Sequence, residues 1–139
     1  APWNLVLACD LPYLSSEWIG WLLARAAASR AQVVLPRTTQ GLEPLAAMYR
    51  RECRKSITAA LAGGVRKVTD ALRALRVEYV EPQEWRAHDP EGYVLQNMNT
   101  PQAYEEARLW WQTRPVSKQG QGTHVRRALK RQRLPDARC

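Results

Sequence analysis

Three short stretches of the sequence carry side chains suited to chemistry on a phosphorylated substrate. In the first, Asp10 directly follows the apolar run Leu5–Cys9. Such a run predicts a strand buried on both faces of a parallel sheet, and ligands bind at the carboxyl ends of such strands. Mg²⁺ bound together with a phosphorylated substrate needs only one or two protein carboxylates. Asp10 is therefore either a metal ligand or the cap of a turn before Pro12, and its position alone favours neither.

The second stretch is "QNMNTP", in which two amides are separated by one residue. If the backbone is extended, Asn97 and Asn99 point to the same side. They would then hold a polar group, or help to surround a metal through water or phosphate. Taken alone, the favoured alternative makes Asn99 a turn residue before a helix and Asn97 a surface group. The N-terminus of the helix that follows offers free backbone N–H groups to an anion.

The third stretch, "GGVRKV", places Arg66 and Lys67 after two glycines. These residues could approach a phosphate, but their spacing matches no phosphate-binding loop. We favour a helix end followed by a solvated basic pair. His88 and His124 have no partner at a recognisable spacing, and Cys9 is most simply a small apolar residue of the buried strand.

Strands that alternate with helices must position these side chains. We expect strands at Leu5–Cys9, at Gln32–Leu35 before Pro36, and in the stretches "RVEYV" and "YVLQN", with a loop in "RTTQGLEP". We expect helices after Ser15 or Ser16, across an apolar stripe from Tyr49 to Leu61, from Val65 to Leu75, and from an N-cap at Thr100 to about Trp111. This alternation predicts a parallel, three-layer α/β domain. Because four strands are few for a doubly wound sheet, we expect the domain to lack its N-terminal half.

The net charge of +8 is unevenly distributed along the 139 residues. Residues 114–139 contain eight Lys or Arg and one Asp, a net charge of +7, whereas residues 1–113 carry +1. We therefore expect one domain in residues 1–113 and a basic, disordered tail in residues 114–139. The nearly neutral body argues against a nucleic-acid-binding domain.

The sequence has no signal of a membrane or secreted protein. No apolar run approaches the roughly 20 residues that span a bilayer, and the N-terminus lacks the basic and apolar regions of a secretory signal. The three cysteines have no metal-ligand spacing, and their odd number argues against a disulfide framework. We expect a cytoplasmic protein with reduced thiols, no membrane contact and no nucleic-acid partner.

Four longer stretches contain these candidates and together span about residues 4–109: "LVLACDLPYLS", "PLAAMYRREC", "LAGGVRKVTDAL" and "DPEGYVLQNMNTPQAYEEAR". Their order resembles that of the molybdenum cofactor guanylyltransferase family. The sharpest pieces are "ACDLP" and "NMNTP", with "EPLAAMY" between them. The resemblance implies a three-layer, Rossmann-like nucleotidyltransferase fold. It also implies Mg²⁺-dependent transfer of GMP from GTP to the terminal phosphate of molybdopterin, with release of pyrophosphate.

The resemblance implies a role for each candidate residue. Asp10, in the family's "CD-x-P" motif, would bind the catalytic Mg²⁺. Asn97 and Asn99, in the "N-x-NTP" motif, would line the site where the pterin substrate and the metal meet. Arg66, in the "G-x-R-[RK]" segment, would contact a substrate phosphate. GTP and molybdopterin would be the two substrates.

The sequence departs from the family pattern at one point. Family members begin with a Gly-rich stretch, LAGG-x-S-x-RMG-x-DK, that follows their first strand and binds the nucleotide triphosphate, and this sequence has none. Residues 1–113 would then be the C-terminal portion of a nucleotidyltransferase domain. That portion would be inactive unless a separate N-terminal half joins it, so enzyme activity of the chain alone is an open question.

Two alternatives stay open. Because residues that would select the base are not visible, the chain could belong to a related nucleotidyltransferase that uses another base or a sugar phosphate. It could instead be a non-enzymatic module that binds polyanions through its basic tail in a salt-dependent way. The tail lacks interleaved aromatic residues and any RNA-binding motif, which counts against this second alternative.

Overall fold

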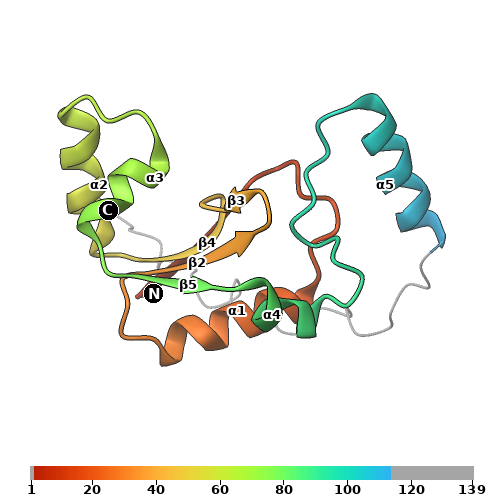
Figure 1. Cartoon of the computed structure of the whole chain (residues 1–139), viewed down its shortest axis with the longest axis horizontal. Helices are drawn as coiled ribbons and strands as arrows, with labels where there is room; N and C mark the ends of the chain where they lie inside the picture. The colour runs from red at the N-terminus through yellow and green to blue at the C-terminus, as the bar shows by residue number, and fades with distance from the viewer. Residues whose placement is uncertain (1, 114–139) are drawn as a thin grey trace, which may run out of the picture.

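The computed structural model describes residues 2–113. Within them, a sheet lies between two layers of helices (Figure 1). The strands are β1 (Trp3–Leu7), β2 (Val33–Thr38), β3 (Gly41–Leu42), β4 (Ala46–Arg50) and β5 (Val77–Val80). The helices are α1 (Ser16–Ala28), α2 (Cys53–Ala62), α3 (Val68–Ala71), α4 (Pro82–Trp85) and α5 (Pro101–Thr113), with 3₁₀ turns η1 (Leu72–Ala74) and η2 (Arg86–His88). This arrangement confirms the predicted three-layer α/β architecture. The tail expected in residues 114–139 lies outside the described residues.

The sheet is mixed rather than purely parallel. Its main path runs β1-β4-β2-β3, and β5 pairs with β2 outside this path. β4 is antiparallel to β1 and β2, whereas β2 and β5 are parallel. The prediction of a helix that begins at Tyr49 was wrong, because Ala46–Arg50 is β4 and α2 begins only at Cys53. Nearly all side chains of β4 are buried, and a short apolar run of this kind does not distinguish a strand from a helix.

The first strand is shifted and lies at an edge of the sheet. β1 ends at Leu7, so Cys9 is an exposed residue of the following turn and not a buried strand residue. Within the described residues β1 pairs only with β4, and the two strands are antiparallel. Val6 and Leu7 are each 37% exposed. Among the described residues β1 is therefore not buried on both faces as predicted, because a short apolar run does not show what covers each face.

The two longest helices begin where the sequence predicts. α1 follows Ser15, whose hydroxyl accepts a 3.1 Å hydrogen bond from the Trp18 N–H. α5 follows Thr100, whose hydroxyl accepts a 3.1 Å hydrogen bond from the Ala103 N–H. In each case a side-chain oxygen satisfies an N–H group that the first helical turn leaves without a partner.

Three further segments differ from the prediction. Pro36 lies inside β2, opposite Val80 of β5, instead of ending the strand. The expected loop in "RTTQGLEP" contains a short hairpin formed by β2 and β3. The stretch "YVLQN" forms a turn and irregular backbone instead of a strand. Its residues Val94 and Leu95 are buried, so the apolar run there reflects burial alone.

Two apolar clusters join the helices to the sheet. One, which includes Trp18 and Leu22, lies on the face covered by α1 and α4. The other, which includes Tyr49, Cys53 and Leu72, lies on the face covered by α2, α3 and η1. Figure 1 shows these two layers on opposite sides of the sheet, with α5 standing beyond one end of it. In residues 2–113 no helix combines the length and apolar character that crossing a membrane requires.

Candidate functional site

Asp10 lies in a turn just beyond the end of β1, where two other segments of the chain meet it. The Ala8 N–H donates a 2.7 Å hydrogen bond to the Leu45 carbonyl, which joins the turn to the segment before β4. The Met98 N–H donates a 2.8 Å hydrogen bond to the Asp10 carbonyl, which joins it to the segment that holds both candidate amides. Backbone bonds therefore bring Asp10 and the "QNMNTP" stretch together.

One carboxylate oxygen of Asp10 has no protein partner. Its Oδ1 is buried and receives no hydrogen bond within the part of the chain that the structure describes. A buried polar atom without a partner costs free energy, and such atoms are rare in folded proteins. The hydrogen bond from the Met98 N–H is accepted by the backbone carbonyl of Asp10 and not by its carboxylate. This contact therefore gives no support to the alternative in which the carboxylate caps the turn.

A second carboxylate, Glu43, faces the same place. Its N–H donates a 2.9 Å hydrogen bond to the Pro36 carbonyl, and its Oε1 accepts a 3.2 Å hydrogen bond from the Thr38 hydroxyl. Burial raises the pKa of Glu43, the Thr38 hydrogen bond opposes this, and the negative charge of Asp10 raises it further. The net result is a pKa above the ordinary value, because burial and the charge of Asp10 outweigh the hydrogen bond.

Two adjoining cavities contain these carboxylates. The smaller has a volume of about 140 Å³, and its lining includes Asp10, Glu43 and Asn97. The larger has a volume of about 370 Å³, and its lining includes Glu43, Asn97, Asn99 and Arg86. Because Glu43 and Asn97 line both cavities, the two share a wall. We call Asp10, Glu43 and Asn97 the carboxylate–amide cluster.

The two predicted amides face one cavity without a strand to hold them. Asn97 and Asn99 lie in irregular backbone, and both line the larger cavity, as expected if they point to the same side. Hydrogen bonds, and not a strand, hold this segment in place. Met98, between the two amides, is tied to the turn after β1, and the Val94 N–H donates a 2.9 Å hydrogen bond to Asp89 Oδ2.

Arg66 lies apart from these residues. It follows the end of α2, is exposed, and its Nη1 lies 3.5 Å from the Leu61 carbonyl. It lines neither of the two cavities. Arg86, the first residue of η2, is a cation that does line the larger cavity. Contact between Arg66 and a substrate phosphate therefore stays a prediction, and Arg86 is the better placed cation.

The donor set suits a hard cation that needs few protein ligands. Residues 2–113 contain no group of three or more His, Cys, Asp or Glu that could hold a metal ion. Mg²⁺ is commonly bound by only one or two carboxylates, together with water and the phosphates of a substrate. Asp10 and Glu43 supply two carboxylates, and the unpartnered Oδ1 of Asp10 is available as a ligand.

Glu43 and Arg86 were not singled out from the sequence. Glu43 belongs to "EPLAAMY", one of the stretches that carry the family resemblance, but a single acid beside a proline has no spacing signal. Arg86 comes from a 3₁₀ turn after α4, and only the fold brings it to the cavity. A search for acids within the resembling stretches would have found Glu43.

The sequence also matches a known protein family. The family described as "MobA-like NTP transferase domain" matches residues 1–78, which is more than half of the chain. The chain belongs to this family. The match includes β1, the turn with Asp10 and the segment with Glu43, so both carboxylates of the MobA-like chain lie within it.

Two curated relatives have informative names. The probable molybdenum cofactor guanylyltransferase of Pelotomaculum thermopropionicum is 32% identical over 105 residues, which cover 76% of this chain and 50% of that protein. The molybdenum cofactor guanylyltransferase of Desulfosudis oleivorans is 31% identical over 102 residues, which cover 73% of this chain and 50% of that protein. The chain thus spans about half the length of these relatives. Their names agree with the predicted family.

A solved structure confirms the fold of this MobA-like chain. The crystal structure of molybdopterin-guanine dinucleotide biosynthesis protein A from Archaeoglobus fulgidus matches with a TM-score of 0.73 at 25% identity. The match covers 81% of this chain and 57% of that protein. The predicted nucleotidyltransferase fold is therefore confirmed over most of the chain, and again a large part of the similar protein has no counterpart in it.

Proposed function

We propose that this chain carries the metal and pterin side of a molybdenum cofactor guanylyltransferase. The proposed reaction transfers GMP from GTP to the terminal phosphate of molybdopterin. The observation that carries the proposal is the buried, unpartnered Oδ1 of Asp10, placed beside Glu43 and Asn97 in a family whose relatives carry this name. A cytoplasmic location belongs to the same proposal.

Asp10 and Glu43 are the residues that would hold Mg²⁺. Asp10 offers an oxygen that lacks a partner within the described residues, and the raised pKa of Glu43 reflects burial together with the neighbouring negative charge. Both features would be relieved by a cation between the two side chains. When bound, Mg²⁺ supplies charge neutralisation for the phosphate oxygens at the reacting centre.

Asn97, Asn99 and Arg86 would bind and orient the substrate that receives GMP. Their cavity, of about 370 Å³, lies in the size range of small-molecule sites. The amides can donate to and accept from a polar ring, and the Arg86 guanidinium can pair with a phosphate. Arg66 is kept as a predicted phosphate contact, although it lines neither cavity.

The reaction requires the protein mainly to align the two substrates and to neutralise charge. An oxygen of the molybdopterin phosphate attacks the α-phosphorus of GTP, a new P–O bond forms, and the bond to the β-phosphate breaks to release pyrophosphate. Phosphoryl transfer of this kind depends on alignment and electrostatic stabilisation more than on acid–base groups. A pair of carboxylates and a few amides that line two adjoining cavities are adequate for that task.

We propose further that residues 1–113 are the C-terminal portion of the domain and work together with its remaining portion. The sequence has no Gly-rich triphosphate loop, and the chain spans about half the length of its relatives. Recognition of GTP would then come from the remaining portion. A nucleotidyltransferase that uses another base or a sugar phosphate is the second candidate, because this sequence shows no residues that would select the base.

A fusion protein tests this function. The half of the Pelotomaculum thermopropionicum relative that this chain does not match is placed before Ala1, and transfer to molybdopterin is measured with GTP and with CTP. We expect GMP transfer by the fusion, none by the chain alone, and loss of transfer in the fusion with Asp10→Asn. Transfer only with CTP or to a sugar phosphate would favour the second candidate. Tight, guanine-specific binding of Mg·GTP by the chain alone, measured by calorimetry, would contradict the proposal.

A further inference from the structure

Arg86 differs from the other described residues that line the larger cavity, because it alone carries a positive charge. Its side chain is exposed, and it forms no ion pair within residues 2–113. An exposed arginine that is free to rotate loses conformational entropy when it binds an anion. An arginine that a neighbouring side chain already holds in place loses less, so its affinity for a phosphate is higher.

Trp85 is the side chain that lies against Arg86. The guanidinium carbon of Arg86 lies 5.8 Å from the centre of the Trp85 ring, and both residues line the larger cavity. A cation within about 6 Å of the centre of an aromatic ring is attracted to the face of that ring. The Trp85 ring therefore favours the rotamers of Arg86 that keep the guanidinium beside the cavity.

The Trp85 ring is itself fixed by packing and by a hydrogen bond. Only 3% of Trp85 is exposed, and the residue belongs to the apolar cluster on the face that α1 and α4 cover. Its indole N–H donates a 2.9 Å hydrogen bond to the Arg37 carbonyl of β2. Because an indole has a single N–H donor, this hydrogen bond selects one orientation of the ring.

The short helix α4, which carries Trp85, is held from two sides. Glu81, directly before α4, forms a 3.1 Å ion pair with Arg37 of β2, and Glu84 forms a 2.9 Å ion pair with Arg25 of α1. The two glutamates also form a capping box at the start of α4, and Pro82 is its first residue. A helix of four residues gains little stability from its own hydrogen bonds, so these contacts determine where Trp85 lies.

The backbone of Arg86 is fixed on both sides as well. Its N–H donates to the Pro82 carbonyl, and its carbonyl accepts a 3.1 Å hydrogen bond from the Asp89 N–H. His88, at the end of η2, stacks on Trp21 of α1 with ring centres 4.8 Å apart and planes 24° apart. These contacts anchor η2 to α1. The main remaining freedom of Arg86 is therefore in its side chain, which lies against Trp85.

We infer that Trp85 is a positioning residue, which holds the Arg86 guanidinium at the wall of the larger cavity so that it binds a phosphate group there. The inference rests on the proposed function, because it takes this phosphate to belong to the substrate that receives GMP. A tryptophan needed for packing alone is replaced by phenylalanine at a cost in stability only. A positioning residue also sets the affinity for phosphate, and this difference can be measured.

Titration of the isotope-labelled chain with inorganic phosphate tests the inference without any transfer reaction. NMR follows the backbone amide signal of Arg86 and the indole N–H signal of Trp85, which is the indole signal that Trp85→Phe lacks. We expect phosphate to shift both signals in the wild type, and the indole shift to disappear in Arg86→Ala. In Trp85→Phe the dissociation constant that the Arg86 amide reports should rise roughly fivefold or more, because the indole hydrogen bond and part of the ring are lost.

Trp18→Phe is the matched control. Trp18 is fully buried in the same apolar cluster as Trp85, and it lines neither cavity of the candidate site. Its indole nitrogen has no hydrogen-bond partner within the described residues. The substitution therefore shrinks the same core but removes no hydrogen bond and no contact with Arg86. We expect it to lower the melting temperature and to change the dissociation constant for phosphate at Arg86 by less than about twofold.

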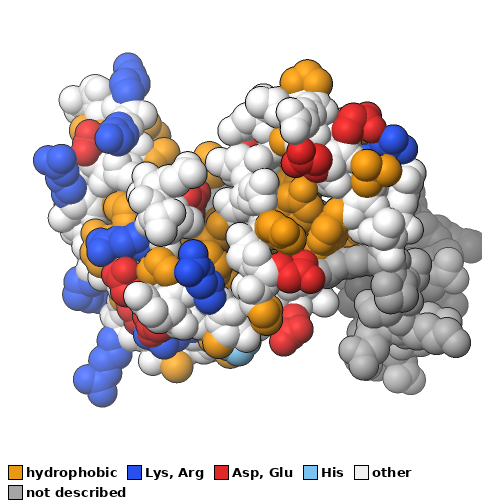
Figure 2. Space-filling model, turned by 45° about the vertical axis from the view of Figure 1, so that its right-hand side comes forward, with side chains coloured by type: hydrophobic (Ala, Val, Ile, Leu, Met, Phe, Trp, Pro, Cys, Tyr) orange, Lys and Arg blue, Asp and Glu red, His pale blue; other side chains and the backbone are white. Residues whose placement is uncertain are grey.

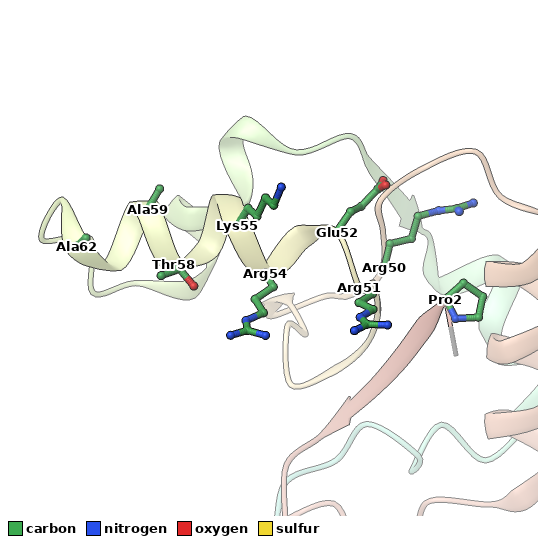
Figure 3. A pocket seen from close by; sticks show the side chains of 9 residues that line it. All are labelled: Pro2, Arg50, Arg51, Glu52, Arg54, Lys55, Thr58, Ala59 and Ala62. Carbon is green, nitrogen blue, oxygen red and sulfur yellow. The ribbon is translucent and has the colours of Figure 1, made fainter.

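Cations elsewhere on the chain supply a second control. A hollow of about 920 Å³ at the start of α2 is lined by Arg51, Arg54 and Lys55, which line neither cavity of the candidate site (Figure 3). Figure 3 shows the Arg51 and Arg54 side chains pointing to the same side of the start of α2. Phosphate that binds there shifts signals of α2. Arg54→Gln should weaken those shifts and leave the dissociation constant at Arg86 unchanged.

Steady-state transfer by the fusion separates a positioning role from a structural one. Trp85→Phe should raise the KM for molybdopterin roughly fivefold or more, and should leave kcat and the KM for GTP within about twofold of the wild type. Arg86→Ala should raise the KM for molybdopterin at least as much. If Trp85 acts through Arg86, the double variant should be no worse than Arg86→Ala alone.

Three outcomes would overturn the inference. The first is a wild-type chain in which phosphate shifts neither the Arg86 amide nor the Trp85 indole signal, a result that needs no core variant to fold. The second is an equal dissociation constant for phosphate in Trp85→Phe and in the wild type. The third is a double variant whose loss equals the two single losses combined. A Trp85-dependent phosphate site in a chain whose fusion transfers no GMP would support the inference and count against the proposed function instead.

Discussion

At the scale of single residues, Asp10 combines two properties that stability alone does not explain. Its carboxylate Oδ1 is buried without a hydrogen-bond partner in the described residues, and Glu43 lies close enough to feel its charge. Each arrangement destabilises the protein without a cation. Functional sites often retain such unfavourable groups because binding a ligand satisfies them.

The first prediction concerns Asp10→Asn. Without Mg²⁺ this variant should be as stable as the wild type or more stable by up to about 1 kcal/mol, because the buried negative charge that repels Glu43 is removed. Added Mg²⁺ should raise the melting temperature of the wild type and not that of the variant. Thermal unfolding with and without Mg²⁺ measures both effects, with Glu17→Gln as a control in which the response to Mg²⁺ is kept. A variant that still responds to Mg²⁺ would exclude Asp10 as a ligand.

The second prediction separates the two groups of candidate substrate contacts. In the active fusion, Asn97→Ala should reduce kcat/KM by roughly tenfold or more, since a polar contact to the substrate is worth about 1.4 kcal/mol. Arg66→Ala should change it by less than about twofold, because Arg66 lines neither cavity. Steady-state GMP transfer compares the two. A large decrease in kcat/KM in Arg66→Ala would indicate that Arg66 contacts the substrate.

At the scale of secondary-structure elements, a polar cluster joins the end of α1 to β5 and α4. Arg25, near the end of α1, donates a 2.5 Å hydrogen bond to Glu78 of β5 and forms a 2.9 Å ion pair with Glu84 of α4. The Ser29 hydroxyl donates to the other oxygen of Glu78. Burial acts to raise the pKa of Glu78, but these hydrogen bonds and the Arg25 charge outweigh it, so the pKa lies below its ordinary value.

The third prediction is a pH dependence from this contact. A depressed carboxylate pKa contributes stability above the unfolded value of 4.5, and this contribution is lost as the pH falls through the folded value. At pH 7, Glu78→Gln should lower the free energy of unfolding by about 1 kcal/mol, a modest figure because solvent screens the half-exposed Arg25. Denaturant unfolding should show this difference shrinking below pH 4.5 and vanishing in stronger acid.

A matched acid makes the pH test specific. Glu105→Gln removes the partner of Arg108 on α5, where the ion pair is 2.7 Å long and both side chains are about half exposed. We expect this variant to lose less than about 0.5 kcal/mol. A Glu78→Gln difference that stays constant from pH 7 into acid would contradict the role given to Glu78.

The elements show what the sequence could and could not predict. Both long helices were predicted from caps and apolar spacing, because those signals are local. β4 was mistaken for a helix and β1 for a strand buried on both faces, because both depend on contacts between segments far apart. At the site, Asp10, Asn97 and Asn99 were found through their motifs. Glu43 and Arg86 were not, because only folding brings them to the cavities.

At the scale of the whole molecule, residues 1–113 are nearly neutral in total, but their basic and acidic side chains lie in different parts of the sequence. Residues 50–76, which include α2 and α3, contain eight basic and two acidic residues, a net charge of +6. The rest of residues 1–113 contains five basic and ten acidic residues, a net charge of −5. Figure 2 shows most Lys and Arg side chains of the visible face on the side that carries α2.

The fourth prediction follows from that separation. The fragment 1–113 should be retained on a cation-exchange column at pH 7 despite a net charge of only +1, since a local patch binds the resin. The double variant Arg51→Glu, Arg54→Glu should elute at clearly lower salt. Arg108→Glu, on α5, should elute much closer to the unchanged fragment. Equal shifts in the two variants would mean that net charge and not the patch governs retention.

The carboxylate–amide cluster is the centre of the account, and Mn²⁺ as a paramagnetic substitute for Mg²⁺ tests it most directly. Titration of small amounts of Mn²⁺ into the isotope-labelled chain should broaden the amide signals of Asp10, Glu43, Asn97 and Met98 before any others. Excess Mg²⁺ should restore these signals, and Asp10→Asn should abolish the effect. Broadening that is spread over the acidic surface, or that persists unchanged in Asp10→Asn, would contradict a metal site at the end of β1.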